Sequence, residues 1–256
     1  VQIGGIATTA GTVDGLQVAG IAAVSRGRAD LQLGGIAAVA GGRAGLQIGG
    51  IATSAGGRAD VQIGGIATAA RGPAGLQIAG IAAVARGAGI QLGGIAAVSR
   101  ADVALQISGI ANVARGRLRG AQIGLVNVAG RSDGMQIGLV NVARAGDGAA
   151  LGLINVVPGG RTELEATVDE QGVGTLVLRH GGRRWHNVYG LGGHAGHALD
   201  DSALARDTWR YGIGIGPTLY AGRTTLDVEA MAWHVMYGDQ RPLGDAAPDA
   251  LNPVSY

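Results

Sequence analysis

The chain has 256 residues and a formal net charge of +2, with 50 glycines, six prolines and no cysteine. The lack of cysteine excludes disulfides, thiolate metal sites and cysteine nucleophiles. A glycine content far above the usual share of about 7%, with few prolines and a positive mean hydropathy, excludes a disordered linker, and the irregular glycine spacing excludes collagen.

One short motif recurs through residues 1–157. A typical copy reads Leu46-Gln47-Ile48-Gly49-Gly50-Ile51-Ala52, and its glutamine returns every 14 to 16 residues. A degenerate eleventh copy covers residues 150–155. A fixed period over more than half of the chain predicts a repeat architecture. The ten glutamines are Gln2, Gln17, Gln32, Gln47, Gln62, Gln77, Gln91, Gln106, Gln122 and Gln136.

Each copy has the pattern of a strand followed by turns. In residues 31–45, Leu31 and Leu33 alternate with Gln32, then a glycine pair, a short apolar run and a Gly/Arg segment follow. Alternation of apolar and polar residues is typical of strands. A helix is disfavoured because glycine recurs in every copy, at about 1 kcal/mol each relative to alanine.

Two β architectures fit this unit, and we favour a β-solenoid of about 11 coils with about 15 residues each. The alternative is an antiparallel meander or β-barrel with one strand per copy, which with later strands would reach a porin-like count of about 16–18. The solenoid explains why single copies, rather than pairs, repeat. It also stacks the glutamines, and the later Asn112, Asn127, Asn141 and Asn155, into hydrogen-bonded ladders. The copies lack the aromatic girdles of a membrane barrel.

In this solenoid we expect Leu46, Ile48 and Ile51 to fill a thin core, with Gln47 and Arg58 facing solvent. Residues 1–160 carry 12 arginines against 6 aspartates and no glutamate. No aromatic side chain lies among these arginines to stack on bases, so we expect no nucleic-acid partner. The threonines Thr8, Thr9, Thr53 and Thr68 are too scattered to form an ice-binding array.

The last copies resemble a known group of envelope proteins. The run Gln-Ile-Gly-Leu-Val-Asn-Val-Ala at 122–129 and 136–143 is similar to the surface-repeat proteins of Gram-negative bacterial envelopes, whose repeat reads roughly G-x-Q-x-G-x-x-N-x-A. The likeness covers residues 1–157 and is looser in the first eight copies. It implies an outer-membrane or cell-surface location and no catalytic role.

Residues 158–256 have a different composition, since all tryptophans and tyrosines lie there. Alternation predicts antiparallel strands over 162–168, 174–178, 211–216 and 226–233, with turns at Gly172 and Gly222 and an irregular tail from Asp239. The segments 209–214 and 233–237 resemble strands of outer-membrane β-barrels. Four or five strands are too few to close such a barrel, so we expect a small sheet that caps or anchors the solenoid.

Candidate sites in the second region are weak. His194 and His197, with Asp200 and Asp201 nearby, could suggest a metal clip, but a zinc site needs three or four convergent ligands. The pairs Glu163/Glu165 and Asp227/Glu229 could suggest glycoside hydrolysis, but the repeats carry no sugar-stacking aromatic residue. The stretch 212–216 lacks the helix that a dinucleotide fingerprint needs.

We therefore predict no catalytic residue, no cofactor-binding residue, no metal ligand and no cofactor. The predicted domains are a solenoid over 1–157 and an antiparallel β domain over 158–256. The predicted function is a non-catalytic structural or interaction protein of the bacterial envelope, a spacer or binding surface for an unidentified envelope partner. The alternatives are a porin-like outer-membrane barrel and a carbohydrate-active or metal-dependent enzyme using His194, His197 and Glu165. No signal peptide is visible, and the chain starts within a copy, so we expect it to be part of a longer or processed protein.

Overall fold

The structure is a computed structural model that describes residues 1–170, 172–194, 208–222 and 224–237. These residues form β-strands and no α-helix. Packing divides the chain into two units, one of residues 1–160 with 181–185 and the other of residues 161–180 with 186–256. Each unit is described by itself.

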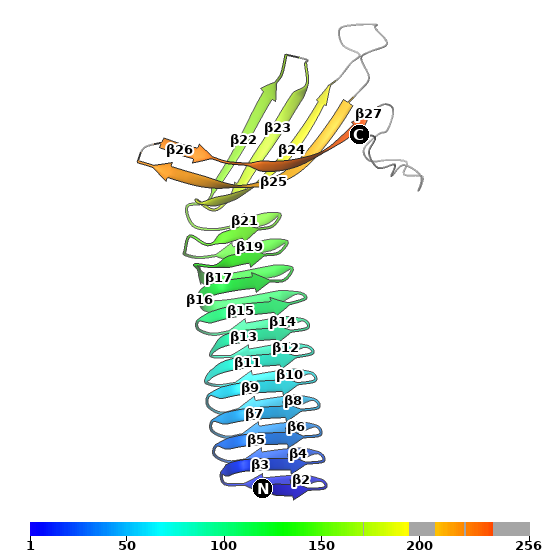
Figure 1. Cartoon of the computed structure of the whole chain (residues 1–256), viewed down its shortest axis with the longest axis vertical. Helices are drawn as coiled ribbons and strands as arrows, with labels where there is room; N and C mark the ends of the chain where they lie inside the picture. The colour runs from blue at the N-terminus through cyan, green and yellow to red at the C-terminus, as the bar shows by residue number, and fades with distance from the viewer. Residues whose placement is uncertain (171, 195–207, 223, 238–256) are drawn as a thin grey trace. The chain divides into compact units, whose positions relative to one another are not determined.

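The first unit is a parallel β-solenoid (Figure 1). Each coil contributes one strand to each of two facing sheets, and equivalent glutamines pair in register, as Gln32 does with Gln47. Ten turns of the chain lead from the first copy to the eleventh. The predicted solenoid is thus confirmed, and the antiparallel meander or porin-like barrel built from the copies is wrong, because neighbouring copies run parallel.

The first sheet contains the glutamines, and the second sheet follows each glycine corner. The strands of the first sheet are β1 (Gln2–Gly4), β3 (Val13–Ala19), β5 (Ala29–Gly34), β7 (Ala44–Gly49), β9 (Ala59–Gly64), β11 (Pro73–Ala79), β13 (Gly87–Gly93), β15 (Val103–Ser108), β18 (Met135–Ile137) and β20 (Ala149–Leu151). Those of the second are β2 (Ala7–Ala10), β4 (Ala22–Ser25), β6 (Ala37–Ala40), β8 (Ala52–Ala55), β10 (Ala67–Ala70), β12 (Ala82–Ala85), β14 (Ala96–Ser99), β17 (Val126–Ser132), β19 (Val140–Ala143) and β21 (Ile154–Val156). The long β16 (Ala111–Ile123) pairs with strands of both sheets.

The core is the reverse of the one predicted from the aliphatic residues. Gln47 is fully buried, whereas Ile48 and Ile51 are 37% and 44% exposed and Leu46 is half-buried. Only the outward direction of Arg58 was predicted correctly. Small buried residues such as Ala38 and Ala40 face the glutamines and let the two sheets approach closely. One long side chain per coil then fills the gap, and the aliphatic side chains on the other strand face point outward.

Glutamine fits this core because its amide is fully hydrogen-bonded there. Gln77 Nε2 donates to Gln62 Oε1 of the preceding coil at 2.8 Å and to the Val84 carbonyl of the facing strand at 3.0 Å. Gln91 then donates to Gln77 Oε1 at 2.8 Å. A buried polar group carries little penalty when its donors and acceptors are paired. The predicted glutamine ladder is confirmed.

In the last coils an asparagine ladder runs beside the glutamines. Asn127 Nδ2 donates to Asn141 Oδ1 at 2.9 Å and to the Ile137 carbonyl at 2.8 Å. The corner here is one residue shorter, with Asn127 five positions after Gln122, whereas Thr53 comes six positions after Gln47. The asparagine amide also reaches the corner itself, at the Gly124 carbonyl, 3.2 Å away. The ladder predicted over the late asparagines is confirmed.

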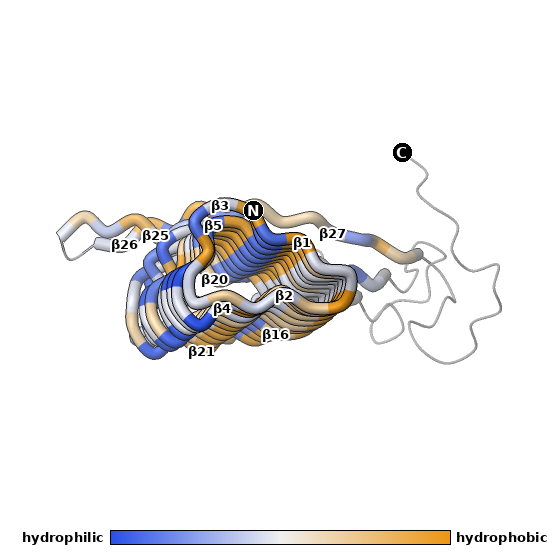
Figure 2. Tube along the Cα trace, turned by 90° about the horizontal axis from the view of Figure 1, so that it is seen from below, coloured by the Kyte–Doolittle hydropathy of each residue, from blue (hydrophilic) through white to orange (hydrophobic). Residues whose placement is uncertain are grey.

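The two corners of each coil differ in how closely successive coils pack and in whether their length varies. At the glycine corner the coils touch, since a Cβ on Gly35 would lie 2.0 Å from the Gly20 carbonyl oxygen. At the opposite corner, rich in arginine, the step length varies. Gln91 follows Gln77 by 14 residues and Gln122 follows Gln106 by 16, yet both pairs stay in register. Figure 2 looks along the stack and shows similar hydropathies superimposed from coil to coil.

The second unit is a curled six-stranded sheet. Its strands are β22 (Arg161–Val168), β23 (Gly174–Gly181), β24 (Trp185–His194), β25 (Thr208–Ala221), β26 (Thr224–Asp227) and β27 (Ala230–Tyr237). They lie in the order β22-β23-β24-β25-β26, and β27 also pairs with β25, in antiparallel register. The predicted turns at Gly172 and Gly222 are confirmed, with φ of 78° and 65°.

Two strand predictions in this sheet were incomplete. Strand β24 is not among the strands that the alternation predicts. The strand predicted over 226–233 is interrupted at Val228 and Glu229, where the Val228 amide donates to the Pro217 carbonyl at 3.1 Å. Glu229 lies at this interruption, and its side chain is only 16% exposed.

Candidate functional site

The outside of the solenoid carries a continuous aliphatic surface. Two columns flank the glutamines on the first sheet, as Leu76 and Ile78 do around Gln77. A third column, the aliphatic corner, holds one Ile or Leu per coil, each 44% exposed or more. Its members are Ile6, Ile21, Ile36, Ile51, Ile66, Ile81, Ile95, Ile110, Leu125, Leu139 and Leu153.

This aliphatic surface is large for an uncovered one. Ten steps of about 4.8 Å give a length of roughly 50 Å, and the three columns give a width of about 10–15 Å. The resulting area of roughly 500–750 Å² lies near or above the upper end of the range for the largest apolar patch of a typical monomer, about 300–600 Å², and approaches the 800 Å² per partner of a stable interface. Patches of this size mark interaction surfaces.

The opposite corner of the coils is basic, and two groups of its arginines differ in whether they have acidic partners. Arg43 and Arg58 both bind Asp60, at 2.7 and 2.8 Å, and their hydrogen bonds lower the pKa of that carboxyl group. Similarly, Asp102 accepts a hydrogen bond from the backbone amide of Arg117 and one from the Arg119 guanidinium, and both lower its pKa. These pairs are exposed, so solvent screens them and they contribute little to stability.

The second group, which we call the arginine column, has no such partners. Within the described residues its members make no ion pair and no side-chain hydrogen bond, and all are exposed. They occupy equivalent positions in four successive coils, about 4.8 Å apart, so neighbouring charges repel by up to about 0.9 kcal/mol in water. The members of the arginine column are Arg71, Arg86, Arg100 and Arg115.

A hollow of about 500 Å³ lies beside the arginine column. It opens because the outward valine of the second sheet, present as Val39 and Val84, is replaced by Ser54 and Ala69 in the two coils between. Arg71, Arg86 and Arg100 line it on the basic side.

In the second unit a polar network connects five strands. Glu229 accepts from Arg179 Nε at 2.6 Å and lies 2.8 Å from His186 Nε2. Arg179 also binds Glu165, at 2.5 Å. Beyond His186, Thr218 Oγ1 lies 3.3 Å from the ring Nδ1 and donates to Asp227 at 2.6 Å. Arg161 closes the network on Asp227 at 2.6 Å.

The order Thr218–His186–Glu229 has the connectivity of a hydroxyl nucleophile, a base and an orienting acid. Its environment does not suit that chemistry. His186 is fully buried and Thr218 is 4% exposed, so no substrate reaches the hydroxyl. Moreover, Thr218 donates its proton to Asp227 rather than to the imidazole. We interpret the network as a structural one, in which most of the charged and polar groups within the sheet are paired with one another.

The carboxylates of the network do not match glycoside hydrolysis either. Burial raises the pKa of Glu229, but hydrogen bonds from Arg179 and His186 outweigh it and leave the pKa below its ordinary value. The pKa of Asp227 is lowered in the same way, by Thr218 and Arg161 against burial. A glycosidase needs a general acid whose pKa is raised.

The other residues considered from the sequence are dispersed. His197, Asp200 and Asp201 lie outside the described residues, and His194 ends β24. Glu163 lies 3.6 Å from Arg161, so it joins the network only at its rim. In the described part of the chain no group of three or more histidine and acidic side chains is placed to hold a metal ion. Among the threonines, Thr53 and Thr68 are buried inside the solenoid, so they cannot contribute to a surface array.

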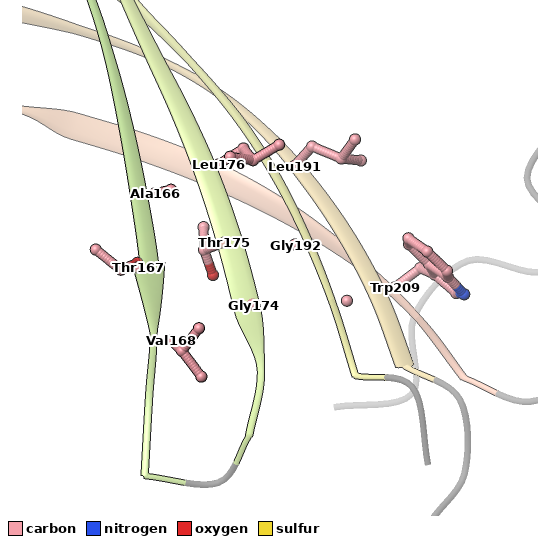
Figure 3. Close-up of a pocket in the computed structure, with 10 residues that line it drawn as sticks. Ala166, Thr167, Val168, Gly174, Thr175, Leu176, Leu191, Gly192 and Trp209 are labelled. Carbon is pink, nitrogen blue, oxygen red and sulfur yellow. The ribbon is translucent and has the colours of Figure 1, made fainter. Parts of the chain in front are cut away.

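One side of the sheet carries exposed apolar side chains. Along β25, Trp209, Tyr211 and Ile213 are 40–66% exposed, while Gly212 and Gly216 between and beyond them are buried. A shallow hollow of about 340 Å³ opens near the end of β22–β25, with Val168, Leu176, Leu191 and Trp209 among its lining side chains (Figure 3). Few polar groups converge there, so it resembles a docking surface more than a catalytic pocket.

Comparisons with known proteins add no assignment: no family model, no curated protein and no solved structure matches this chain. In the residues that the structure describes, no helix is long and apolar enough to cross a membrane.

Proposed function

We propose that this chain is a non-catalytic structural and interaction protein of the bacterial envelope, in which the solenoid is both a rigid spacer and a binding surface. The observation that carries the proposal is the continuous aliphatic surface on the outside of the first sheet and its corner. An outward Ile or Leu in every coil is unfavourable in water at about 25 cal/mol per Å² of apolar area. A surface that retains it along the whole stack is best explained by a partner that covers it.

The ladders support the spacer role. Every interior glutamine from Gln17 to Gln136 bonds to the preceding coil and to the facing strand, so each coil is fixed to its neighbours. In a repeat array of this kind stability is the sum of local and neighbour terms, and the length is set by the number of copies.

The envelope location rests on the resemblance of the late copies at 122–129 and 136–143 to surface-repeat proteins. The apolar, aromatic side of the C-terminal sheet is compatible with association at the outer membrane. A partner of the aliphatic surface is then another envelope component.

Two measurements test this proposal. The first follows an epitope-tagged chain, expressed with its native gene context, through fractionation of Gram-negative cells. We expect it in the outer-membrane or surface fraction, and recovery in the cytosol would contradict the location.

The second measures cosedimentation with purified envelope fragments. A variant with Ile66→Ser, Ile81→Ser and Ile95→Ser should bind at least tenfold more weakly. The matched control, Val24→Ser, Val39→Ser and Val113→Ser, changes the same number of apolar residues on the other sheet and should bind normally. Equal binding by both variants would remove the aliphatic surface from the account.

A further inference from the structure

The arginine column differs from every other charged feature of the solenoid, because four like charges stand in line without a carboxylate. We propose that this column binds an extended acidic polysaccharide, a chain with a carboxylate or sulfate on each sugar. The inference goes beyond the proposed function and does not depend on the envelope location or on the aliphatic surface.

The first argument is the contrast with neighbouring arginines. On the same corner, Arg43 and Arg58 share Asp60, and Arg28 pairs with Asp14. The fold therefore places aspartates beside arginines at other positions of this corner. In the arginine column the sequence supplies none, so the charges are left for a ligand. Arginine suits this task because its planar fork binds carboxylate and sulfate oxygens in pairs.

The second argument is the hollow beside the column. Ser54 and Ala69 stand where neighbouring coils have an outward valine, the valine row of Val39 and Val84. The resulting space of about 500 Å³ reaches three of the four arginines. Its floor is formed by small apolar residues, among them Ala55 and Ala70, with the Ser54 side chain at the rim. A sugar ring has both a polar edge and an apolar face, so it can lie on this floor while its anionic group meets a guanidinium.

The linear arrangement selects the kind of anion. A single phosphate or carboxylate needs donors that converge on one point, whereas these guanidinium groups follow one another along the stack at the rung spacing. A linear polymer with one charge per unit uses all of them at once, which raises the effective concentration of each successive contact. Nucleic acid also has regular charges, but single strands need aromatic side chains for stacking, and residues 1–157 contain none.

The test measures binding of a fluorescently labelled oligogalacturonate of about ten sugars to the full chain by anisotropy at low salt. Changing Arg86→Gln and Arg100→Gln should weaken binding about tenfold. The matched control is Arg26→Gln with Arg144→Gln, which removes the same net charge from two unpaired arginines outside the column and should change binding less than twofold. Circular dichroism checks that both variants remain folded.

A second variant leaves the charges in place. Ser54→Val with Ala69→Val restores the valine row and fills the hollow, and we expect it to weaken binding at least threefold. Galacturonic acid monomer should not compete at equal sugar concentration. Equal loss in the column variant and its control, or tighter binding of a single-stranded oligonucleotide of the same charge, would overturn the proposal. If the unmodified chain does not bind oligogalacturonate but still cosediments with envelope fragments, the polysaccharide proposal is overturned and the proposed function stands.

Discussion

Replacing Gln77 with leucine removes three hydrogen bonds from the centre of the ladder while keeping a side chain of similar size. Gln77 donates to Gln62 Oε1 and to the Val84 carbonyl, and accepts from Gln91. Each bond contributes about 0.5–1.5 kcal/mol net, and the orphaned Gln62 oxygen is buried, which carries a further penalty of about 1–3 kcal/mol. Leucine regains part of this through its more favourable apolar transfer, so we expect a loss of about 3–5 kcal/mol.

The assay is urea denaturation of the full chain followed by far-ultraviolet circular dichroism. The matched control is Gln2→Leu, because Gln2 is exposed and only accepts from Gln17, which keeps its bond to the Val24 carbonyl. We expect this control to lose less than about 1 kcal/mol. If Gln77→Leu unfolds at the same urea concentration as the native chain, the ladder is not what stabilises the core, and the reasoning is refuted.

Three further predictions concern the core and the polar network. Ala83→Leu, at a fully buried site between the sheets, should destabilise the solenoid by about 1–3 kcal/mol through overpacking, whereas Ile81→Leu on the surface should be neutral in urea denaturation. Glu229→Gln should destabilise the C-terminal sheet by about 2–3 kcal/mol, since Arg179 then loses a mostly buried carboxylate partner, and an unchanged tryptophan-fluorescence transition would contradict this. Because the folded-state pKa values of Asp227 and Glu229 lie below their unfolded values of about 3.9–4.3, their contribution is present above that range and is lost as pH falls through the folded values. Acid titration to about pH 3 should therefore lower the melting temperature reported by tryptophan fluorescence. The circular dichroism of the solenoid at 218 nm should persist, because its glutamine ladder does not titrate. Parallel loss of both signals would refute this prediction.

The repeat period was sufficient to predict the architecture. Copies of one strand-and-turn unit, each with a glutamine at the same place, require equivalent surroundings, and only parallel stacking provides them. The ladder followed from the same argument, because stacked amides are spaced for hydrogen bonding.

The direction of the side chains was predicted wrongly, for a physical reason. In a strand such as Leu46-Gln47-Ile48, alternation shows that the glutamine and the aliphatic residues lie on opposite faces, but not which face is inside. General hydrophobicity favours Leu46 and Ile48 as the core. The invariance of glutamine, together with alanine and glycine at the other alternating positions, was the signal that the interior is narrow and polar.

The polar network was beyond the reach of sequence patterns. Arg179 lies on β23, His186 on β24 and Glu229 at the interruption between β26 and β27, so they meet only through long-range pairing, and β24 was not predicted. The interruption at Val228, where the backbone amide donates to the Pro217 carbonyl, leaves no periodic mark in the sequence. The arginine column, by contrast, is visible in the sequence once the register of the coils is known.

The most direct test of the account is hydrogen exchange of the glutamine side-chain amides, followed by NMR on ¹⁵N-labelled full-length chain. Nine glutamines, from Gln17 to Gln136, are fully buried and donate within the ladder. We predict that their Nε2 protons exchange orders of magnitude more slowly than those of the exposed Gln2, at rates close to those of the core backbone amides. If all glutamine side chains exchange at the rate of free amides, the glutamines face solvent, and the buried ladder that organises the solenoid does not exist.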